Sequence, residues 1–187
     1  MNLILIGPPG AGKGTQAKHL VKKLNNFQIS TGDMLRDEIQ KNTKIGKKIL
    51  NDMNDGNFVS DQIVNALIEN VLRDPKKKGR LIFDGYPRSL TQAKNFEQLL
   101  IKTNQVIDFI FFLNVNKETI IKRIEQRKII EKRSDDDLET IVKRYDTYMD
   151  TTKPVLNFYS QNSNFYEIDG SSKIEEITSK IDNFLNV

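Results

Sequence analysis

Gly7-Pro8-Pro9-Gly10-Ala11-Gly12-Lys13 is the stretch of sequence that decides the fold. It directly follows an apolar run, Leu3 to Ile6, and precedes a segment with the apolar spacing of a helix. The pattern G-x-x-x-x-G-K between a strand and a helix is typical of a phosphate-binding loop. Its glycines let successive N–H groups point at phosphate oxygens, and the helix start adds the positive end of its dipole. The stretch therefore predicts a nucleoside triphosphate site, with Lys13 on the β- and γ-phosphates, rather than a plain glycine turn.

Two positions bear on magnesium. The Ser or Thr that usually follows the lysine is Gly14 here, and Thr15 comes one position later. We therefore expect Mg²⁺ to be held mainly by phosphates and water, while Thr15 can donate to a phosphate. Asp84 ends the apolar run Leu81 to Phe83, where a carboxylate that organises the water shell of the metal belongs. A turn-capping Asp is the alternative, because Asp84-Gly85 is also a turn signal.

The rest of the chain repeats the alternation of strand and helix. Segments with helical spacing, such as that of Ile63, Leu67 and Val71, separate short apolar runs. This order predicts an α/β fold of the P-loop NTPase type, with a five-stranded parallel sheet flanked by helices. Ligands bind at the carboxyl ends of the strands in such folds. The five runs are rich in Ile, Leu and Phe, as in strands covered on both faces, and span residues 3–6, 27–29, 81–83, 107–113 and 165–168.

Two segments interrupt this alternation. Residues 30–59 have helical spacing without a strand, and residues 127–137 are short, polar and dense in charge. We expect both to be mobile pieces on one domain, because 187 residues are too few for two domains of ordinary size. The core then comprises 1–29, 60–126 and 138–187. A further polar stretch, Asp74 to Gly79, is expected to be a solvated turn, although its lysines leave a phosphate role open.

Composition excludes several classes of function. The chain has no cysteine, which removes disulfides, thiolate catalysis and a cysteine zinc site. Its one histidine, His19, cannot build a histidine metal site and is expected at the surface. The net charge of +4 is spread among nearly as many acids, which indicates a solvated surface rather than a nucleic-acid interface. No apolar run could span a membrane, and the strand at Leu3 leaves no room for a signal segment, so we expect a cytoplasmic protein.

Several long motifs occur in one order along the chain, and in them the chain resembles adenylate kinases over essentially its whole length. The motifs are GPPGAGKGTQA from Gly7, STGDMLR from Ser30, DGYPRSLTQA from Asp84, KRIEQR from Lys122, RSDDDLETIVKRYDTY from Arg133 and the strand end Tyr166 to Gly170. The loop form GKGT is the family form, which explains Gly14. The resemblance implies reversible Mg²⁺-dependent phosphoryl transfer, ATP + AMP = 2 ADP, in adenine nucleotide homeostasis, by a protein that is usually a monomer.

The resemblance also implies roles for the basic side chains, since phosphoryl transfer depends on positioning and electrostatics. Arg36 and Arg88 would hold the AMP phosphate, and Arg123 would stack on the ATP adenine. No general base is implied, because the acceptor phosphate is already an oxyanion. The catalytic set is Lys13, Asp84, Arg88, Arg127, Arg133 and Arg144.

Two nucleotide pockets follow from the same resemblance. The ATP pocket comprises Gly10, Ala11, Gly12, Lys13, Gly14, Thr15, Arg123, Arg127 and Ser172. The AMP pocket comprises Thr31, Gly32, Arg36, Met53, Gly56, Asn57, Val59, Gly85, Arg88, Gln92, Arg133 and Arg144. Residues 30–59 are then an AMP-binding insertion and residues 127–137 a short lid, without the β-rich piece or the zinc site of long-lid relatives. Position 126 is Gln where many relatives have Gly or Lys.

Two other functions share features with this sequence. A uridylate/cytidylate kinase shares the fold, lid and arginines, but Thr31 stands where such relatives have Ala, and Ser89 where they tend to have Asn. Gln92 carries an amide that can pair with an adenine edge. A non-catalytic nucleotide-binding module leaves the placed arginines unexplained, and no N-K-x-D element of a GTPase is present. The sequence therefore favours AMP as the acceptor.

Overall fold

The computed structural model of the chain contains a central parallel sheet. It describes the backbone of residues 1–131 and 138–187 and the side chains of residues 1–126 and 139–187. In this part of the chain the sheet has five strands in the order β2-β3-β1-β4-β5, and every neighbouring pair is parallel. The prediction of a five-stranded parallel sheet is therefore confirmed. The strands are β1 (Leu3–Ile6), β2 (Phe27–Ser30), β3 (Leu81–Asp84), β4 (Phe109–Asn114) and β5 (Phe165–Asp169).

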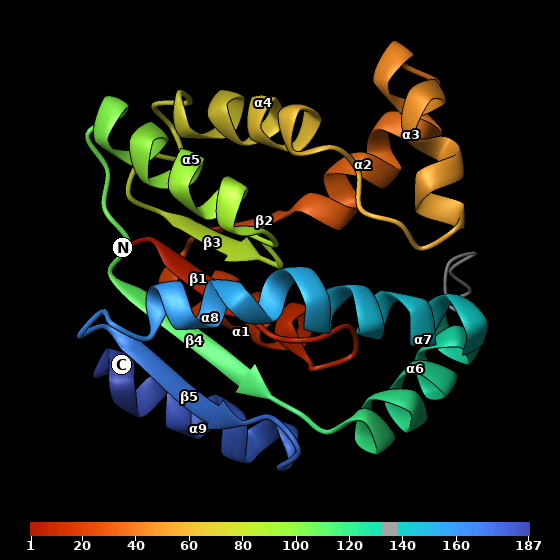
Figure 1. The fold of residues 1–187 in the computed structure, drawn as a ribbon. Coiled ribbons are helices and arrows are strands. Elements are labelled where there is room, and N and C mark those ends of the chain that lie inside the picture. Colours follow the sequence, from red (N-terminus) through yellow and green to blue (C-terminus); the bar gives the residue numbers. More distant parts are fainter. Residues whose placement is uncertain (132–137) are drawn as a thin grey trace.

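Helices cover both faces of the sheet (Figure 1). Apolar side chains of α4 (Asp61–Leu72), α5 (Leu90–Lys102) and α8 (Lys153–Tyr159) pack on one face, and those of α1 (Lys13–Leu24), α6 (Lys117–Glu131) and α9 (Ile174–Leu185) on the other. Central strand β1 divides its residues between the two layers, because neighbouring side chains of a strand point to opposite faces. Ile4 belongs to the first layer and Leu3 and Leu5 to the second, and all three are fully buried. This double burial explains why the strands read as continuous apolar runs.

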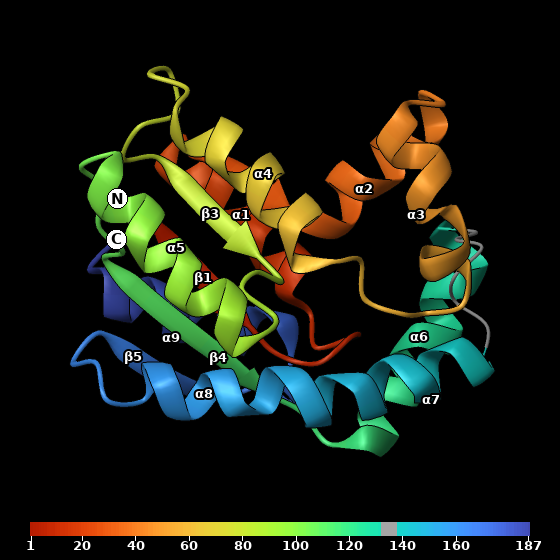
Figure 2. The ribbon, with the colours of Figure 1, turned by 45° about the horizontal axis from the view of Figure 1, so that its top comes forward.

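The predicted insertion forms a pair of helices that stands beside the sheet (Figures 1 and 2). These helices are α2 (Thr31–Gln40) and α3 (Lys44–Asn54). Ser30 and Thr43 cap them, since each side-chain oxygen accepts a backbone N–H of the first turn. At the crossing, a β-carbon on Gly46 would lie 2.0 Å from the carbonyl oxygen of Glu38, so only glycine fits there.

The second predicted insertion is partly helical. Helix α6 continues to Glu131, through Arg127, because the run after Ile124 contains good helix formers and no glycine or proline. Helix α7 (Leu138–Thr147) follows residues 132–137 and leads through a π-helical turn, η1 (Tyr148–Thr152), into α8. The first residues of the expected short insertion, 127–131, are therefore helical, and residues 132–137 lie outside the described part.

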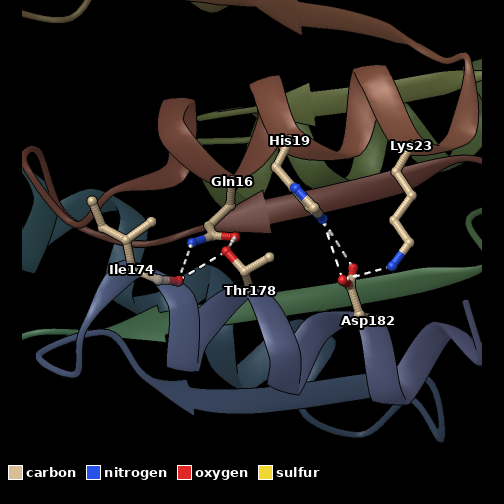
Figure 3. Close-up of polar contacts among 6 residues, drawn as sticks. All are labelled: Gln16, His19, Lys23, Ile174, Thr178 and Asp182. Carbon is tan, nitrogen blue, oxygen red and sulfur yellow. Dashed lines mark hydrogen bonds and ion pairs between the residues drawn. The ribbon is translucent and has the colours of Figure 1, made fainter.

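His19 is half-buried rather than a plain surface residue. Its Nε2 lies 3.2 Å from Asp182 Oδ1, and Lys23 Nζ lies 2.7 Å from Asp182 Oδ2. Gln16, buried on the same helix, bonds the Ile174 carbonyl and the Thr178 hydroxyl (Figure 3). Polar contacts therefore join α1, which starts at the phosphate-binding loop, to α9 along its length.

No helix in the described residues is both long and apolar enough to cross a bilayer.

Candidate active site

The loop from Gly7 to Lys13 has the backbone curl that the glycine pattern predicts. Gly10 and Gly12 have φ of 77° and 91°, in the left-handed region that favours glycine. Helix α1 begins immediately after Gly12, so its first N–H groups face the loop. Lys13 folds back over the loop, and its Nζ donates to the carbonyl oxygens of Gly7 and Pro8 at 2.8 Å and 2.9 Å. A loop of amide groups and one ammonium group suits an anion such as a phosphate chain.

Asp84 lies beside this loop at the end of β3. A β-carbon placed on Gly14 would lie 3.5 Å from Asp84 Oδ2, so the carboxylate faces the start of α1. Gln28 Nε2 donates to the same oxygen at 2.8 Å. Strand pairing explains the contact, because Ser30 of β2 lies opposite Asp84 and Gln28 is two residues before it on the same face. The structure therefore places one oriented carboxylate next to the predicted phosphates.

Arg88 is held in the turn after β3. Its Nε donates to the Gly85 carbonyl at 2.7 Å, and its guanidinium lies 5.3 Å from the ring centre of Phe58. The distance is that of a cation–π contact. A β-carbon on Gly85 would lie 3.2 Å from Arg88 Nη2 and 3.7 Å from Lys13 Cε. Gly85 thus lies between the lysine of the loop and the arginine of the turn, and brings the two cations to one place.

The insertion contributes a second arginine. Arg36 Nη2 donates to Asp33 Oδ1 at 2.6 Å on the first turns of α2. Thr31 is buried, and its hydroxyl donates to the Gly85 carbonyl at 3.2 Å, which ties α2 to the turn of Arg88. The insertion and the turn therefore form one side of the site.

Helix α7 meets this side at Gly56. The glycine has φ of 69°, and a β-carbon there would lie 2.9 Å from Thr140 Cγ2 and 3.2 Å from Arg144 Cγ. The end of the insertion and the helix after the predicted lid are therefore in contact. This contact brings Arg144 next to the insertion.

The opposite side of the site is formed by α6 and the start of α9. Arg123 donates to the Gly170 carbonyl at 2.7 Å and to the Ser172 carbonyl at 3.4 Å, which fixes its guanidinium across the loop after β5. In that loop, the Ser171 N–H and the Ser172 hydroxyl both donate to Asp169. These bonds, the one from the Ser171 N–H foremost, hold the pKa of Asp169 below its usual value. A fixed, planar cation is suited to stack on a nucleobase.

Between these two sides lies a cleft of about 530 Å³, a size common for small-molecule sites. Cationic side chains outnumber acidic ones among the described residues of its lining. The described side chains that line it include Asp33 and Asp84 and six cations, namely Lys13, Lys18, Arg36, Arg88, Arg123 and Arg144. Such a cleft attracts polyanions.

The cleft brings together most of the residues that the sequence predicts. It is lined by Gly10, Ala11, Gly12, Lys13, Gly14, Thr15, Gly32, Arg36, Met53, Gly56, Asn57, Asp84, Gly85, Arg88, Arg123 and Arg144. Among the predicted residues with described side chains, four do not line it. Of these, Thr31, Val59 and Gln92 are buried, and Ser172 contributes its carbonyl to Arg123. Arg127 lies on α6 with its side chain outside the described part, and Arg133 lies outside the described residues altogether.

The sequence did not single out Gln28, Phe58 and Ile174, which also line the cleft. Phe58 had a weak signal, since both its neighbours were assigned to the AMP pocket. Ile174 is 54% exposed, and exposure of a large apolar side chain beside a cleft is visible only in the folded chain.

Comparison with known proteins agrees with this geometry. A family model described as adenylate kinase matches residues 5–164. The chain belongs to the adenylate kinase family. The loop, the turn at Arg88 and most of the cleft lie within the matched residues, so the family assignment covers the site itself.

Relatives named adenylate kinase support the same assignment over the full chain. The protein of Pelagibacter ubique (strain HTCC1062) is 49% identical, and the alignment covers all of both chains. The protein of Caulobacter sp. (strain K31) is 41% identical over 187 residues, covering 100% of this chain and 99% of the relative. The protein of Mycoplasma mycoides subsp. mycoides SC is 42% identical, covering 90% of this chain and 91% of the relative. The Pelagibacter alignment extends over 213 positions, so that adenylate kinase has segments that this chain lacks.

Proposed function

We propose that this cleft moves a phosphoryl group reversibly between ATP and AMP, forming two ADP. The chain is a phosphotransferase by its membership of the adenylate kinase family. The observation that carries the assignment to this cleft is the position of Gly85, within van der Waals reach of both Lys13 and Arg88. A triphosphate on the loop and a monophosphate at the turn would therefore have their phosphates next to each other.

Electrostatics explain what the residues would do. ATP would lie on Gly10 to Thr15, with Lys13 at its terminal phosphates and Arg123 stacked on its adenine. AMP would place its phosphate at Arg36 and Arg88, and Arg144 would approach the transferring group from α7. Placed cations in a water-poor cleft stabilise charge that is spread over the oxygens in the transition state. The AMP phosphate is the nucleophile and already an oxyanion, so the proposal needs no general base.

Magnesium fits the donor set around the loop. The described residues contain no cluster of three or more His, Cys, Asp or Glu side chains that could enclose a metal. Mg²⁺ is commonly held by one or two carboxylates together with nucleotide phosphates and water, and Asp84 is a carboxylate in that position. Asp84 would then orient the water shell of a magnesium ion that neutralises phosphate charge when it is bound.

The choice of AMP over UMP or CMP remains part of the proposal. Thr31 and Gln92 support it through the family resemblance, and both are buried and hydrogen-bonded to residues of the cleft, Gly85 and Arg88. Gln92 is only 2% exposed, so a direct contact with adenine requires that the amide become accessible when AMP binds. Residues 30–59 would act as the AMP-binding insertion and residues 127–137, with Arg127 and Arg133, as a short lid.

We also propose that the protein acts as a cytoplasmic monomer that binds neither nucleic acid nor membranes. The mixed surface charge and the absence of cysteine support this proposal. Closure of the lid and the insertion over both nucleotides would exclude water, which would otherwise accept the phosphoryl group and waste ATP.

The test is ADP formation from ATP and Mg²⁺ with AMP, UMP or CMP offered separately. We expect rapid ADP formation with AMP and little transfer to either pyrimidine nucleotide. A preference for UMP or CMP would overturn the acceptor assignment. If ATP binds and no acceptor receives a phosphoryl group, the cleft is a binding site without catalysis.

A further inference from the structure

We propose that Asp61 is a positioning residue for catalysis, which holds Arg88 in place through the buried amide of Gln92. The inference rests on the proposed function, in which Arg88 binds the acceptor phosphate. Asp61 itself does not line the cleft, and no sequence motif singles it out. Its role follows from the hydrogen bonds that it accepts.

Asp61 is the first residue of α4 and reaches across to the start of α5. Its Oδ1 accepts Gln92 Nε2 at 2.7 Å, and its Oδ2 accepts the Ser89 hydroxyl at 2.8 Å. Both partners are 28 or more residues away along the chain. Hydrogen bonds to an ionised carboxylate are among the stronger ones in proteins. One side chain thus bonds two residues at the start of α5, directly after Arg88.

These bonds settle the orientation of the Gln92 amide. A carboxylate only accepts and a backbone N–H only donates. Gln92 Nε2 faces Asp61, and its Oε1 accepts the Arg88 N–H at 2.8 Å. If the amide were flipped, its oxygen would face the Asp61 carboxylate and its NH₂ group would face the Arg88 N–H. Gln92 is 98% buried, so water could not relieve these mismatched contacts. Gln92 therefore transmits the position of Asp61 to the backbone of Arg88.

The backbone of Arg88 is held on its other side as well. Thr152, at the end of η1, donates its hydroxyl to the Arg88 carbonyl at 2.9 Å. The Arg88 Nε bond to Gly85 fixes the direction of the guanidinium. A small misplacement of a catalytic cation can cost about 100-fold in rate. The hydrogen bonds that hold Arg88 therefore have a direct effect on turnover.

The first test removes the carboxylate that accepts from Gln92 and Ser89. Asp61→Ala leaves Gln92 Nε2 and the Ser89 hydroxyl without their acceptor, and we expect kcat with saturating AMP to fall about 10- to 100-fold. Asp61→Asn should stay within about threefold of the wild type, because its oxygen can accept from Gln92 and its amide can donate to the Ser89 hydroxyl. The dissociation constant of ATP alone should not change in either variant. Wild-type kcat in a folded Asp61→Ala variant would overturn the proposal.

The second test uses the directions of the hydrogen bonds. Gln92→Glu places two carboxylates face to face and should lower kcat as much as Asp61→Ala does. Adding Asp61→Asn to Gln92→Glu supplies an amide that donates to the new carboxylate, which still accepts the Arg88 N–H. We expect kcat of the double variant to recover at least fivefold over Gln92→Glu. No recovery would contradict the proposal, and this pair of variants leaves no cavity if Asp61→Ala fails to fold.

Two controls separate the possible causes of a negative result. Glu69→Ala removes another acid of α4, which is partly exposed and pairs with Arg73 four residues later, and it should leave all constants unchanged. The folded fraction of each variant, from circular dichroism and urea unfolding, separates a structural role from positioning, since a structural role makes kcat follow the folded fraction. Failure of the wild type to form ADP from ATP and AMP would refute the proposed function instead.

Discussion

Arg88 illustrates how much a single side chain in this cleft depends on its surroundings. Its N–H and Nε bond nearby residues, its carbonyl accepts from the distant Thr152, and its guanidinium lies over Phe58. An arginine fixed in this way loses little conformational freedom when it binds an anion. The structure therefore presents a preorganised cation rather than a flexible one.

The ring of Phe58 should contribute to AMP binding through its contact with Arg88. Phe58→Ala removes the ring that supports the Arg88 guanidinium, a contact of about 0.5–2 kcal/mol. We expect KM for AMP to rise about 2- to 30-fold, the equivalent of that energy, with KM for ATP nearly unchanged. Steady-state kinetics with each nucleotide varied in turn measure both constants. Leu90→Ala removes an apolar side chain near the same turn but outside the cleft, and it should change neither. An unchanged KM for AMP in Phe58→Ala would refute the role of the ring.

The sequence predicts some of these residues and misses others for a physical reason. Gly10, Gly12 and Lys13 belong to one short pattern whose spacing is dictated by phosphate binding. Gln28 and Asp61 act through contacts with residues 56 and 28–31 positions away. No local pattern encodes such contacts, because they depend on strand order and helix packing. The same holds for the buried environment of Gln92, whose amide looked available in the sequence.

At the scale of elements, the crossing of α2 and α3 sets the shape of the insertion. Gly46 lies inside α3, where alanine would favour the helix by about 1 kcal/mol if the site were open. The Glu38 carbonyl occupies the space next to Gly46, so the β-carbon of alanine would force the two helices apart. The helix pair therefore depends on one close backbone approach.

Gly46→Ala should destabilise the protein despite its better helix propensity. Overpacking commonly costs about 1–3 kcal/mol, which exceeds the propensity gain. We also expect a higher KM for AMP, since Met53 and Gly56, near the end of α3, line the cleft. Urea unfolding and kinetics measure the two effects. Lys47→Ala, exposed on the same helix, is the control and should stay within about 0.5 kcal/mol. Equal or greater stability of Gly46→Ala would disprove the close approach.

The sequence predicts which strands are present better than it predicts the residues at which they begin and end. The five apolar runs correspond to the five strands, since a strand buried on both faces needs a continuous apolar stretch. Residues 107 and 108 were included in β4 but precede it, because the carboxylate of Asp108 accepts the backbone N–H of Asn2. The charge-dense segment from Arg127 begins within α6, which continues to Glu131. Charge density alone does not separate a helix with a solvated face from a loop.

At the scale of the whole molecule, the two sides of the cleft belong to elements that are joined to one sheet. The carboxyl ends of β3 and β4 point toward the region where α2, α3, α6 and α7 lie (Figure 2). The layers on the two faces of the sheet hold these elements in place. In the described residues, the hydroxyls of Tyr148 and Tyr159 are buried in this packing without a hydrogen-bond partner.

Buried tyrosines predict a loss of stability in alkali. Burial raises the pKa of Tyr86, Tyr148 and Tyr159 well above the ordinary value of about 10. The unfolded chain then loses these protons at lower pH than the folded chain does. The contribution to stability is therefore complete below about pH 10 and is lost as the pH rises above it. Urea unfolding at a series of alkaline pH values should show a falling free energy of unfolding, with a smaller fall in Tyr159→Phe. Equal slopes in both proteins would contradict the prediction.

In the proposed function, one cleft holds ATP on the loop of Lys13 and AMP at the turn of Arg88. Calorimetric titration of each nucleotide separately into the wild type, Lys13→Ala and Arg88→Ala tests it most directly. We predict that Lys13→Ala loses affinity for ATP and retains AMP binding, whereas Arg88→Ala loses AMP and retains ATP. Equal loss of both nucleotides in both folded variants, or no loss in either, would contradict the account.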